Sequence, residues 1–203
     1  MRRLGSGARL LVATHNAGKL EEMRQILGPR GLSVEGAAAH GLPEPAETEE
    51  TFLGNARLKA LAAARATGLP ALADDSGIAV EALGGAPGVR TADWAEGPGG
   101  RDFLRAMTRT HEALLAARAP EPWRARFVCV LVLAWPDGSE AAFEGICEGR
   151  VVWPPRGRMG HGYDPVFVPE GETRTFAEMD PAEKNALSHR GRALRAFAAA
   201  CLP

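Results

Sequence analysis

The chain has 203 residues, of which 45% are hydrophobic and 24% are charged, as in an ordinary water-soluble globular protein. Its formal net charge of −1 provides no overall attraction to nucleic acid or to an anionic membrane surface, so neither is expected as a partner. No apolar run approaches the ~18 residues of a membrane span, and no signal-peptide pattern is evident. The sequence therefore predicts a cytoplasmic protein with one domain, residues 1–203.

The first predicted unit is a strand, a polar loop and a helix. Residues 9–14 (RLLVAT) read as a buried strand, and residues 19–27 (KLEEMRQIL) as an amphipathic helix. Backbone amides at such a helix start, together with Lys19, favour an anion. An ordinary turn, in which Thr14 and Asn16 only cap the helix, is the alternative.

A weak strand around Leu32–Val34 is followed by an acidic loop, residues 40–50, in which one carboxylate could reach a metal. Residues 51–67 then form an Ala-rich helix that ends at Gly68 and Pro70. Asn55 and Lys59 are four residues apart and share a face of this helix. If that face meets the segment around Asp75, Lys59 brings a second cation to the same site.

Two adjacent carboxylates, Asp74 and Asp75, end the short apolar run 69–73 and precede Ser76 and Gly77. We expect them at a strand end that leads into a Gly-rich loop, where open α/β sheets place their ligands. Because side chains alternate along a strand, one carboxylate can anchor the structure while the other enters a cleft. Asp-Asp-Ser-Gly is also good turn chemistry, and a plain turn is the alternative.

Residues 101–118 predict a helix with Phe103/Leu104, Met107 and Leu114/Leu115 inward and with His111 toward solvent. Residues 126–135 are the most apolar run and predict a central strand, followed by a turn at 136–139, a partner strand over 140–149 and a short strand at 151–153. The odd cysteine count argues against a disulfide framework, and Cys129, inside the apolar run, is expected to be buried.

The C-terminal part begins with a Gly-, Pro- and Arg-rich loop, residues 154–169, whose alternative interpretation is a surface hairpin with an anchored tyrosine. Asp180, Pro181 and Glu183 form a helix-start signature, with Asp as the N-cap and Glu three residues on. We expect one helix over residues 181–200.

Several separated segments together resemble the inosine/xanthosine triphosphate pyrophosphatase family. They are ATHNAGKLEEM (13–23), ETEETFLGNARLKA (47–60), LADDSGIAVEALGGAPGVRTADWA (72–95), GHGYDPVFVP (160–169) and EKNALSHRGRAL (183–194). The resemblance covers essentially the whole chain. It implies an α/β fold with a long twisted mixed β-sheet flanked by helices, in two lobes with the active cleft between them, and it implies a homodimer.

The resemblance also implies an activity, namely Mg²⁺-dependent hydrolysis of ITP, dITP and XTP to the nucleoside monophosphate and pyrophosphate. Asp75 would be the general base and a magnesium ligand, and Glu47 the second ligand. The remaining predicted residues would bind substrate: Thr14, His15, Asn16, Ala17, Gly18, Lys19, Lys59 and Ser76 at the phosphates, and His161, Gly162, Tyr163, Asp164, Lys184, His189 and Arg190 at the base. Cations and Mg²⁺ suit this chemistry because a nucleoside triphosphate carries about four negative charges.

Two positions depart from the family pattern. Gly54 stands where a Glu is common, and His161 stands where an aromatic residue is common.

Three alternative functions stay open. They are a pyrophosphatase for modified pyrimidine nucleotides, a nucleotide sensor without catalysis, and a serine hydrolase that uses Ser76. The last lacks the GxSxG elbow.

Overall fold

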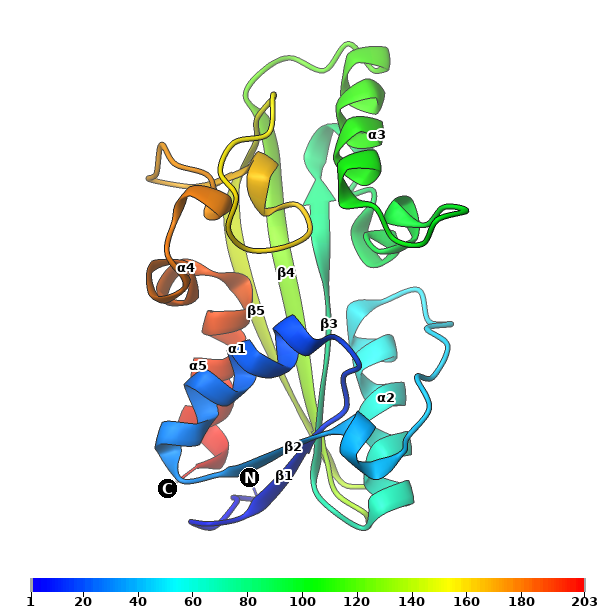
Figure 1. The fold of residues 1–203 in the computed structure, drawn as a ribbon, viewed down its shortest axis with the longest axis vertical. Coiled ribbons are helices and arrows are strands. Elements are labelled where there is room, and N and C mark those ends of the chain that lie inside the picture. The colour runs from blue at the N-terminus through cyan, green and yellow to red at the C-terminus, as the bar shows by residue number, and fades with distance from the viewer. Residues whose placement is uncertain (1, 203) are drawn as a thin grey trace. The chain divides into compact units, whose positions relative to one another are not determined.

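A computed structural model describes residues 2–202, and the chain folds into two compact units (Figure 1). Unit 1 comprises the chain up to Asp75, residues 129–145 and the chain from Arg190 onward. Unit 2 comprises residues 76–128 and 146–189. The organisation as one domain and the active cleft both stay predictions.

A six-stranded sheet has the order β2-β1-β3-β4-β5-β6. Its strands are β1 (Arg9–Val12), β2 (Ser33–Gly36), β3 (Ala71–Val80), β4 (Trp123–Ala134), β5 (Glu140–Val151) and β6 (Phe167–Pro169). The helices are α1 (Ala17–Leu27), α2 (Phe52–Thr67), α3 (Phe103–Ala116), α4 (Pro181–Leu187) and α5 (His189–Cys201). The sheet is mixed, because β1 runs parallel to its neighbours β2 and β3 whereas β5 and β6 run antiparallel to each other. The predicted α/β class is confirmed.

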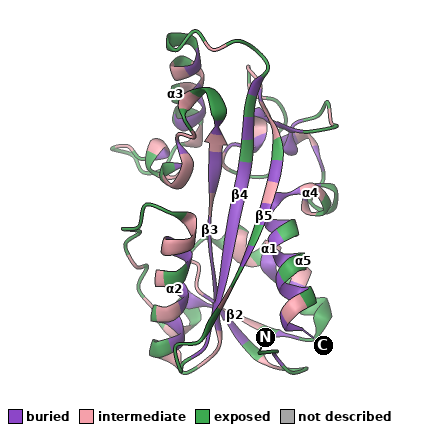
Figure 2. Ribbon diagram, turned by 180° about the vertical axis from the view of Figure 1, so that it is seen from behind, coloured by how far each residue is buried: buried purple, intermediate pink, exposed green. Residues whose placement is uncertain are grey.

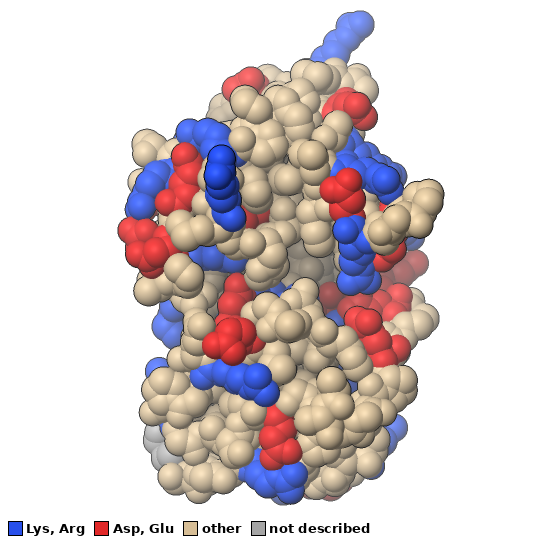
Figure 3. Space-filling view, in the orientation of Figure 1, with Lys and Arg blue, Asp and Glu red and all other residues tan. Residues whose placement is uncertain are grey.

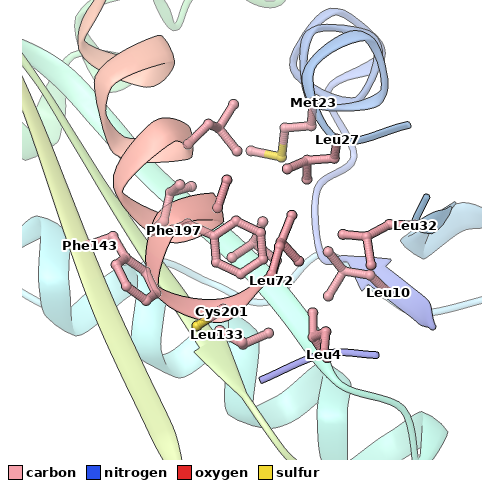
Figure 4. Close-up of a cluster of buried hydrophobic side chains, with 14 of the residues drawn as sticks. Leu4, Leu10, Met23, Leu27, Leu32, Leu72, Leu133, Phe143, Phe197 and Cys201 are labelled. Atoms are coloured by element: carbon pink, nitrogen blue, oxygen red, sulfur yellow. The ribbon is translucent and has the colours of Figure 1, made fainter. Parts of the chain in front are cut away.

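The core of unit 1 lies where α1 and α5 pack on the sheet (Figure 4). Met23 and Leu27 of α1 and Phe197 of α5 are fully buried, and they meet Leu72 of β3 and Leu133 of β4 in one apolar cluster. The 3.6-residue periodicity read from the sequence places these helix residues on the inner face. This packing fixes α1, and with it the predicted phosphate loop, against β3.

Unit 2 has its own core, in which α3 and the aromatic residues of the C-terminal loops cover one face of β3, β4 and β5. Phe127, Phe167 and Phe176 pack together, with ring centroids 4.6 to 6.1 Å apart. Such aromatic clusters bury large areas and favour edge or offset contacts. The segments that carry the predicted base-binding residues 161–164, Lys184 and His189 are therefore held by the apolar core of unit 2, whereas Arg190 belongs to unit 1.

The burial of β4 changes along its length (Figure 2). Phe127 to Ala134 are all buried, as expected of a strand covered on both faces, whereas Trp123 to Arg126 alternate between buried and exposed. The predicted central strand is confirmed, since β4 lies between β3 and β5. The turn before β5 is confirmed as well, because the Trp135 N–H donates to the Ser139 carbonyl over 2.9 Å.

The predicted helix over 181–200 is wrong in one respect, because it is broken into α4 and α5. Ser188 between them is extended, with φ −66° and ψ 156°. Its N–H still donates to the Lys184 carbonyl over 2.8 Å and closes α4. No Gly or Pro marks the break, and apolar periodicity resumes after it, so the pattern alone could not reveal the change of direction.

Three smaller expectations are also wrong. Leu104 and Leu115 of α3 are each 57% exposed, because neighbouring helix positions point about 100° apart and it is Phe103, Met107 and Leu114 that face the core. His111 is half-buried and stacks on Trp153, with ring centroids 4.4 Å apart. Residues 151–153 form no separate strand, since β5 runs on to Val151 and the next strand is β6.

The helix caps follow the sequence closely. Thr51 caps α2 by accepting from the Gly54 N–H over 3.0 Å, and Gly68 ends that helix with φ 69°. Asp180 caps α4 by accepting from Ala182 and Glu183, and the Glu183 side chain completes the capping box. Local chemistry is sufficient to set these boundaries.

Other expectations concern the chain as a whole. Cys129, Cys147 and Cys201 are buried thiols. Among residues 2–202, no helix is both long and apolar enough to cross a membrane. On the face shown in Figure 3, acidic and basic side chains are interspersed, in keeping with the near-zero net charge.

Candidate active site

Asp74 and Asp75 lie within β3, not at its end, because the strand continues to Val80. Both the predicted strand end and the alternative of a plain turn are therefore wrong. The predicted opposite orientation of the pair is confirmed: the Asp74 carboxylate meets α1 and α5, and the Asp75 carboxylate meets α2. Alternation along an extended strand sends the two side chains to opposite faces of the sheet.

Asp74 is a buried anion held by two cations. Its Oδ2 lies 3.0 Å from Lys19 Nζ and 3.3 Å from Arg190 Nη2, and the residue is 2% exposed. Burial alone would raise the pKa of Asp74, but the charges of Lys19 and Arg190 outweigh it and hold the pKa far below its ordinary value. Arg190 Nη1 also donates to Glu22 Oε2 of α1 over 2.5 Å. Asp74 thus anchors α1 and α5 to the sheet.

Asp75 has a different environment on the other face of β3. Asn55 Nδ2 donates to its Oδ2 over 3.1 Å, and Lys59 Nζ lies 3.9 Å from its Oδ1. Burial raises the pKa of Asp75 to about 6; Lys59 and Asn55 lower it, but the nearby Glu47 carboxylate raises it further. A carboxylate that takes up a proton near neutral pH is suited to act as a general base.

Lys59 joins the two predicted acidic ligands. Its ammonium group donates to Glu47 Oε1 in addition to the contact with Asp75. Burial alone would lower the pKa of Lys59, but the carboxylates of Asp74, Asp75 and Glu47 raise it, so the side chain stays a cation. The sequence spacing correctly placed Asn55 and Lys59 on one helix face, and in the structure that face meets Asp75.

The loop before α1 is arranged as a capped helix start. Asn16 Oδ1 accepts from the Lys19 N–H over 3.1 Å, and Thr14 Oγ1 accepts from the Asn16 N–H over 3.2 Å. His15, Asn16, Ala17 and Gly18 are exposed, and Ser76 on β3 is partly buried. The capping is confirmed; phosphate binding by this loop and by Ser76 stays a prediction, and the two are compatible because capping leaves other amides of the first turn open.

The predicted base-binding residues of unit 2 differ in exposure. His161 is exposed, whereas Tyr163, Asp164 and Lys184 are buried. Lys184 Nζ donates to Asp164 Oδ2 over 2.7 Å, and the same oxygen accepts from the His161 N–H over 2.7 Å. The Asp164–Lys184 pair therefore holds the loop that presents His161.

Tyr163 and His189 are held by contacts that the sequence did not reveal. The Tyr163 hydroxyl donates to the Ala106 carbonyl over 3.1 Å and lies 3.0 Å from Thr110 Oγ1, both in α3. His189 stacks on Phe127 of β4, with ring centroids 4.6 Å apart and 8° between the planes. The sequence did not reveal the partners Phe127, Thr110 and Glu22, because each lies in an element far along the chain from the residue it contacts. Only for Glu22 was there a signal, since its spacing of three residues from Lys19 places both on one face of α1.

The oxygen-rich pair Glu47 and Asp75 fits a magnesium ion. Magnesium prefers oxygen ligands and keeps several waters, so one or two carboxylates suffice. Both carboxylates contact the Lys59 ammonium group, so their oxygens lie close to one another beside α2. Within residues 2–202 no group of three or more His, Cys, Asp or Glu side chains is placed to hold a metal, and magnesium binding by this pair stays a prediction.

Comparison with known proteins assigns the family. The Ham1 family profile matches residues 10–200. The chain belongs to the Ham1 family. It is 64% identical to a dITP/XTP pyrophosphatase of Ruegeria pomeroyi over 99% of this chain and 98% of that protein, and 59% identical to one of Gluconobacter oxydans over 100% and 95%. The family resemblance read from the motifs is thereby confirmed.

Solved structures of Ham1 proteins have the same fold. A HAM1 protein from Coxiella burnetii superposes with a TM-score of 0.87 at 38% identity and covers 95% of this chain and 98% of its own. A nucleoside-triphosphatase / dITP/XTP pyrophosphatase from Mycobacterium abscessus has a TM-score of 0.72 at 40% identity, with 93% and 98% covered. The predicted α/β architecture is therefore shared across the family.

Proposed function

We propose that this protein hydrolyses the deaminated purine nucleoside triphosphates ITP, dITP and XTP to the nucleoside monophosphate and pyrophosphate. The observation that carries the proposal is the buried Asp75 carboxylate, which lies 3.1 Å from Asn55 Nδ2 and 3.9 Å from Lys59 Nζ, with Lys59 also paired to Glu47. The named activity of relatives with 59% and 64% identity supports the choice of substrate.

The chain's residues divide the chemistry. Asp75 orients a water molecule and accepts its proton as the water oxygen attacks the α-phosphorus. The bond between the α-phosphorus and the oxygen that bridges it to the β-phosphorus breaks, and pyrophosphate leaves with that oxygen. Lys19 and Lys59 stabilise the charge that develops on the phosphates. Magnesium held by Glu47 and Asp75 would supply charge neutralisation and orientation of the phosphate oxygens.

Base selection is proposed to use hydrogen-bond donors toward the 6-oxo group. Adenine carries an amino donor there and would leave the protein's donors unpaired, which discriminates strongly. Arg190, which was predicted at the base, would be one such donor; its Nη1 and Nη2 atoms already donate to Glu22 and Asp74, so this role requires their remaining N–H groups. The exposed imidazole of His161 would stack on the purine.

The test is a pyrophosphate-release assay across ITP, dITP, XTP, GTP and ATP, with and without a chelator. We expect release from the first three, far less from GTP and ATP, and none when Mg²⁺ is removed. Higher turnover of modified pyrimidine triphosphates would favour the related pyrophosphatase. Tight ITP binding without pyrophosphate release would favour a sensor, and insensitivity to chelation would revive a hydrolase that uses Ser76.

The proposed setting is the cytoplasm, where the enzyme would remove deaminated purines from the nucleotide pool. We further propose a homodimer, as the family resemblance implies. Sedimentation velocity of the purified chain checks this directly, with a species of twice the 21.5 kDa monomer mass expected.

A further inference from the structure

Asn55 of α2 connects the acidic loop to Asp75. Its Oδ1 accepts from the Glu49 N–H over 3.0 Å, and its Nδ2 donates to the Glu49 carbonyl over 3.2 Å. The same Nδ2 donates to Asp75 Oδ2 over 3.1 Å. With 2% of its surface exposed, Asn55 makes these contacts away from bulk water. One side chain thus binds both the loop backbone and the candidate base.

Only an amide of this length supplies this set of contacts. A carboxamide offers two N–H donors and a carbonyl acceptor, and all three are used here. The donor to Asp75 and the acceptor from Glu49 together fix which end of the amide is nitrogen. An aspartate at this position would keep the acceptor, lose both donors and bring a second carboxylate against Asp75.

Gly54 allows the loop to approach the helix so closely. A Cβ atom at Gly54 would lie 2.6 Å from Glu49 Cβ and 2.9 Å from Glu49 Cγ, closer than real atoms pack. The departure from the family pattern noted at this position therefore has a structural reason here. The glycine makes room for Glu49 over the first turn of α2.

Lys59 completes the arrangement one helical turn beyond Asn55. It contacts Glu47 from the loop and Asp75 from β3. The loop carrying Glu47 is thus attached to α2 at two places, and each place also contacts Asp75.

We propose that Asn55 is a positioning residue, which holds the loop carrying Glu47 in register with Asp75 so that the two carboxylates act as a unit. The inference deepens the proposed function and rests on it for the chemistry of Glu47 and Asp75. A residue that only satisfied buried backbone groups would affect stability without coupling to Glu47.

A double-mutant cycle separates these roles. Asn55→Ala, Glu47→Gln and the double variant are compared by kcat and KM for ITP and by the Mg²⁺ concentration for half-maximal rate. We expect each single variant to have a kcat/KM about 10–100-fold below that of the wild-type protein, as is typical of residues that orient metal ligands. The kcat/KM of the double variant should be little lower than that of Glu47→Gln. If the two reductions in kcat/KM multiply in the double variant, the proposal is overturned.

Two readouts do not depend on turnover. Calorimetric titration with Mg²⁺ alone is expected to show weaker binding to Asn55→Ala than to the wild-type protein. A glutamate-specific protease is expected to cleave the loop of residues 44–50 faster in the variant. Unchanged Mg²⁺ affinity together with unchanged cleavage would overturn the role of Asn55.

Matched variants guard against trivial explanations. Arg57 lies on the same helix, and Arg57→Gln removes only a surface ion pair with Glu140. The kcat/KM of this variant should stay within about 2-fold of the wild-type value. Gly54→Ala should loosen the same loop without touching Asp75 and keep the proposal testable if Asn55→Ala does not fold. If the wild-type protein releases no pyrophosphate, the proposed function fails, while Mg²⁺ binding and loop cleavage still decide the role of Asn55.

Discussion

At the scale of single residues, the adjacent aspartates show that two identical side chains at neighbouring strand positions can have different chemical environments. Asp74 is neutralised by Lys19 and Arg190 and keeps a strongly lowered pKa, whereas the pKa of Asp75 rises to about 6. The one-residue alternation of the strand is visible in sequence. The cations that meet each carboxylate come from α1, α2 and α5, and only folding brings these together.

Replacing the candidate base tests the division of roles. Asp75→Asn should lower kcat by at least about 10²-fold, because general-base catalysis is worth roughly 10²–10⁴. The fold should survive, since the amide removes a buried charge and retains an acceptor for Asn55. Steady-state kinetics with ITP and a thermal melt measure the two effects. Near-normal turnover in a folded variant would contradict the assignment.

Tyr163 provides a pH prediction, because it is the only tyrosine in the chain. Burial raises the pKa of its phenol from 10.0 to about 12, opposed in part by the hydrogen bond with Thr110. The Tyr163 phenol therefore loses its proton at a higher pH in the folded state than in the unfolded state. The free energy of unfolding should consequently fall as pH rises from about 10 to about 12. Phenolate absorbance of the native and the denatured protein checks this; equal midpoints would contradict a buried hydroxyl.

At the scale of elements, caps and turns are where sequence reasoning succeeds. The predicted stop at Gly68 and the predicted Asp180–Glu183 box set helix ends through contacts within a few residues. Thr51, predicted as the first helical residue, is the N-cap of α2. The break at Ser188 and the length of β3 were missed, because both are decided by packing partners far away in sequence. His189, directly after the break, stacks on Phe127 of β4.

Removing the cap of α4 should have a measurable cost. Asp180→Ala takes away the acceptor for the Ala182 and Glu183 N–H groups and should lower the free energy of unfolding by about 1 kcal/mol. Denaturant titration measures it. The control Glu112→Ala, at an exposed position of α3, should change stability by less than about 0.5 kcal/mol. Equal effects of the two substitutions would argue against the cap.

At the scale of the whole molecule, β3, β4 and β5 each run through both units. Each unit has its own apolar core, yet the strands that line the two cores are the same. Loss of either core should therefore loosen the strands on which the other is built, and we expect unfolding as one cooperative transition.

A core substitution tests this expectation. Leu72→Ala removes a fully buried side chain from the core of unit 1 and should lower the free energy of unfolding by about 2–5 kcal/mol. Three of the four tryptophans, Trp94, Trp123 and Trp153, lie in unit 2. Their fluorescence should shift to the same lower denaturant midpoint as the circular dichroism. Two separate midpoints would show that the units unfold independently.

The sequence by itself determined the family, the α/β class, the end of α2 at Gly68, the cap of α4 and the opposite orientation of Asp74 and Asp75. These depend on spacings and on chemistry within a few residues. The tertiary structure alone decided that the aspartates lie inside a strand, that Arg190 binds Asp74 and Glu22, and that Asn55 joins the Glu47 loop to Asp75. Those contacts join residues up to 168 positions apart. No local pattern encodes such pairs, because their geometry is set by the packing of helices on the sheet.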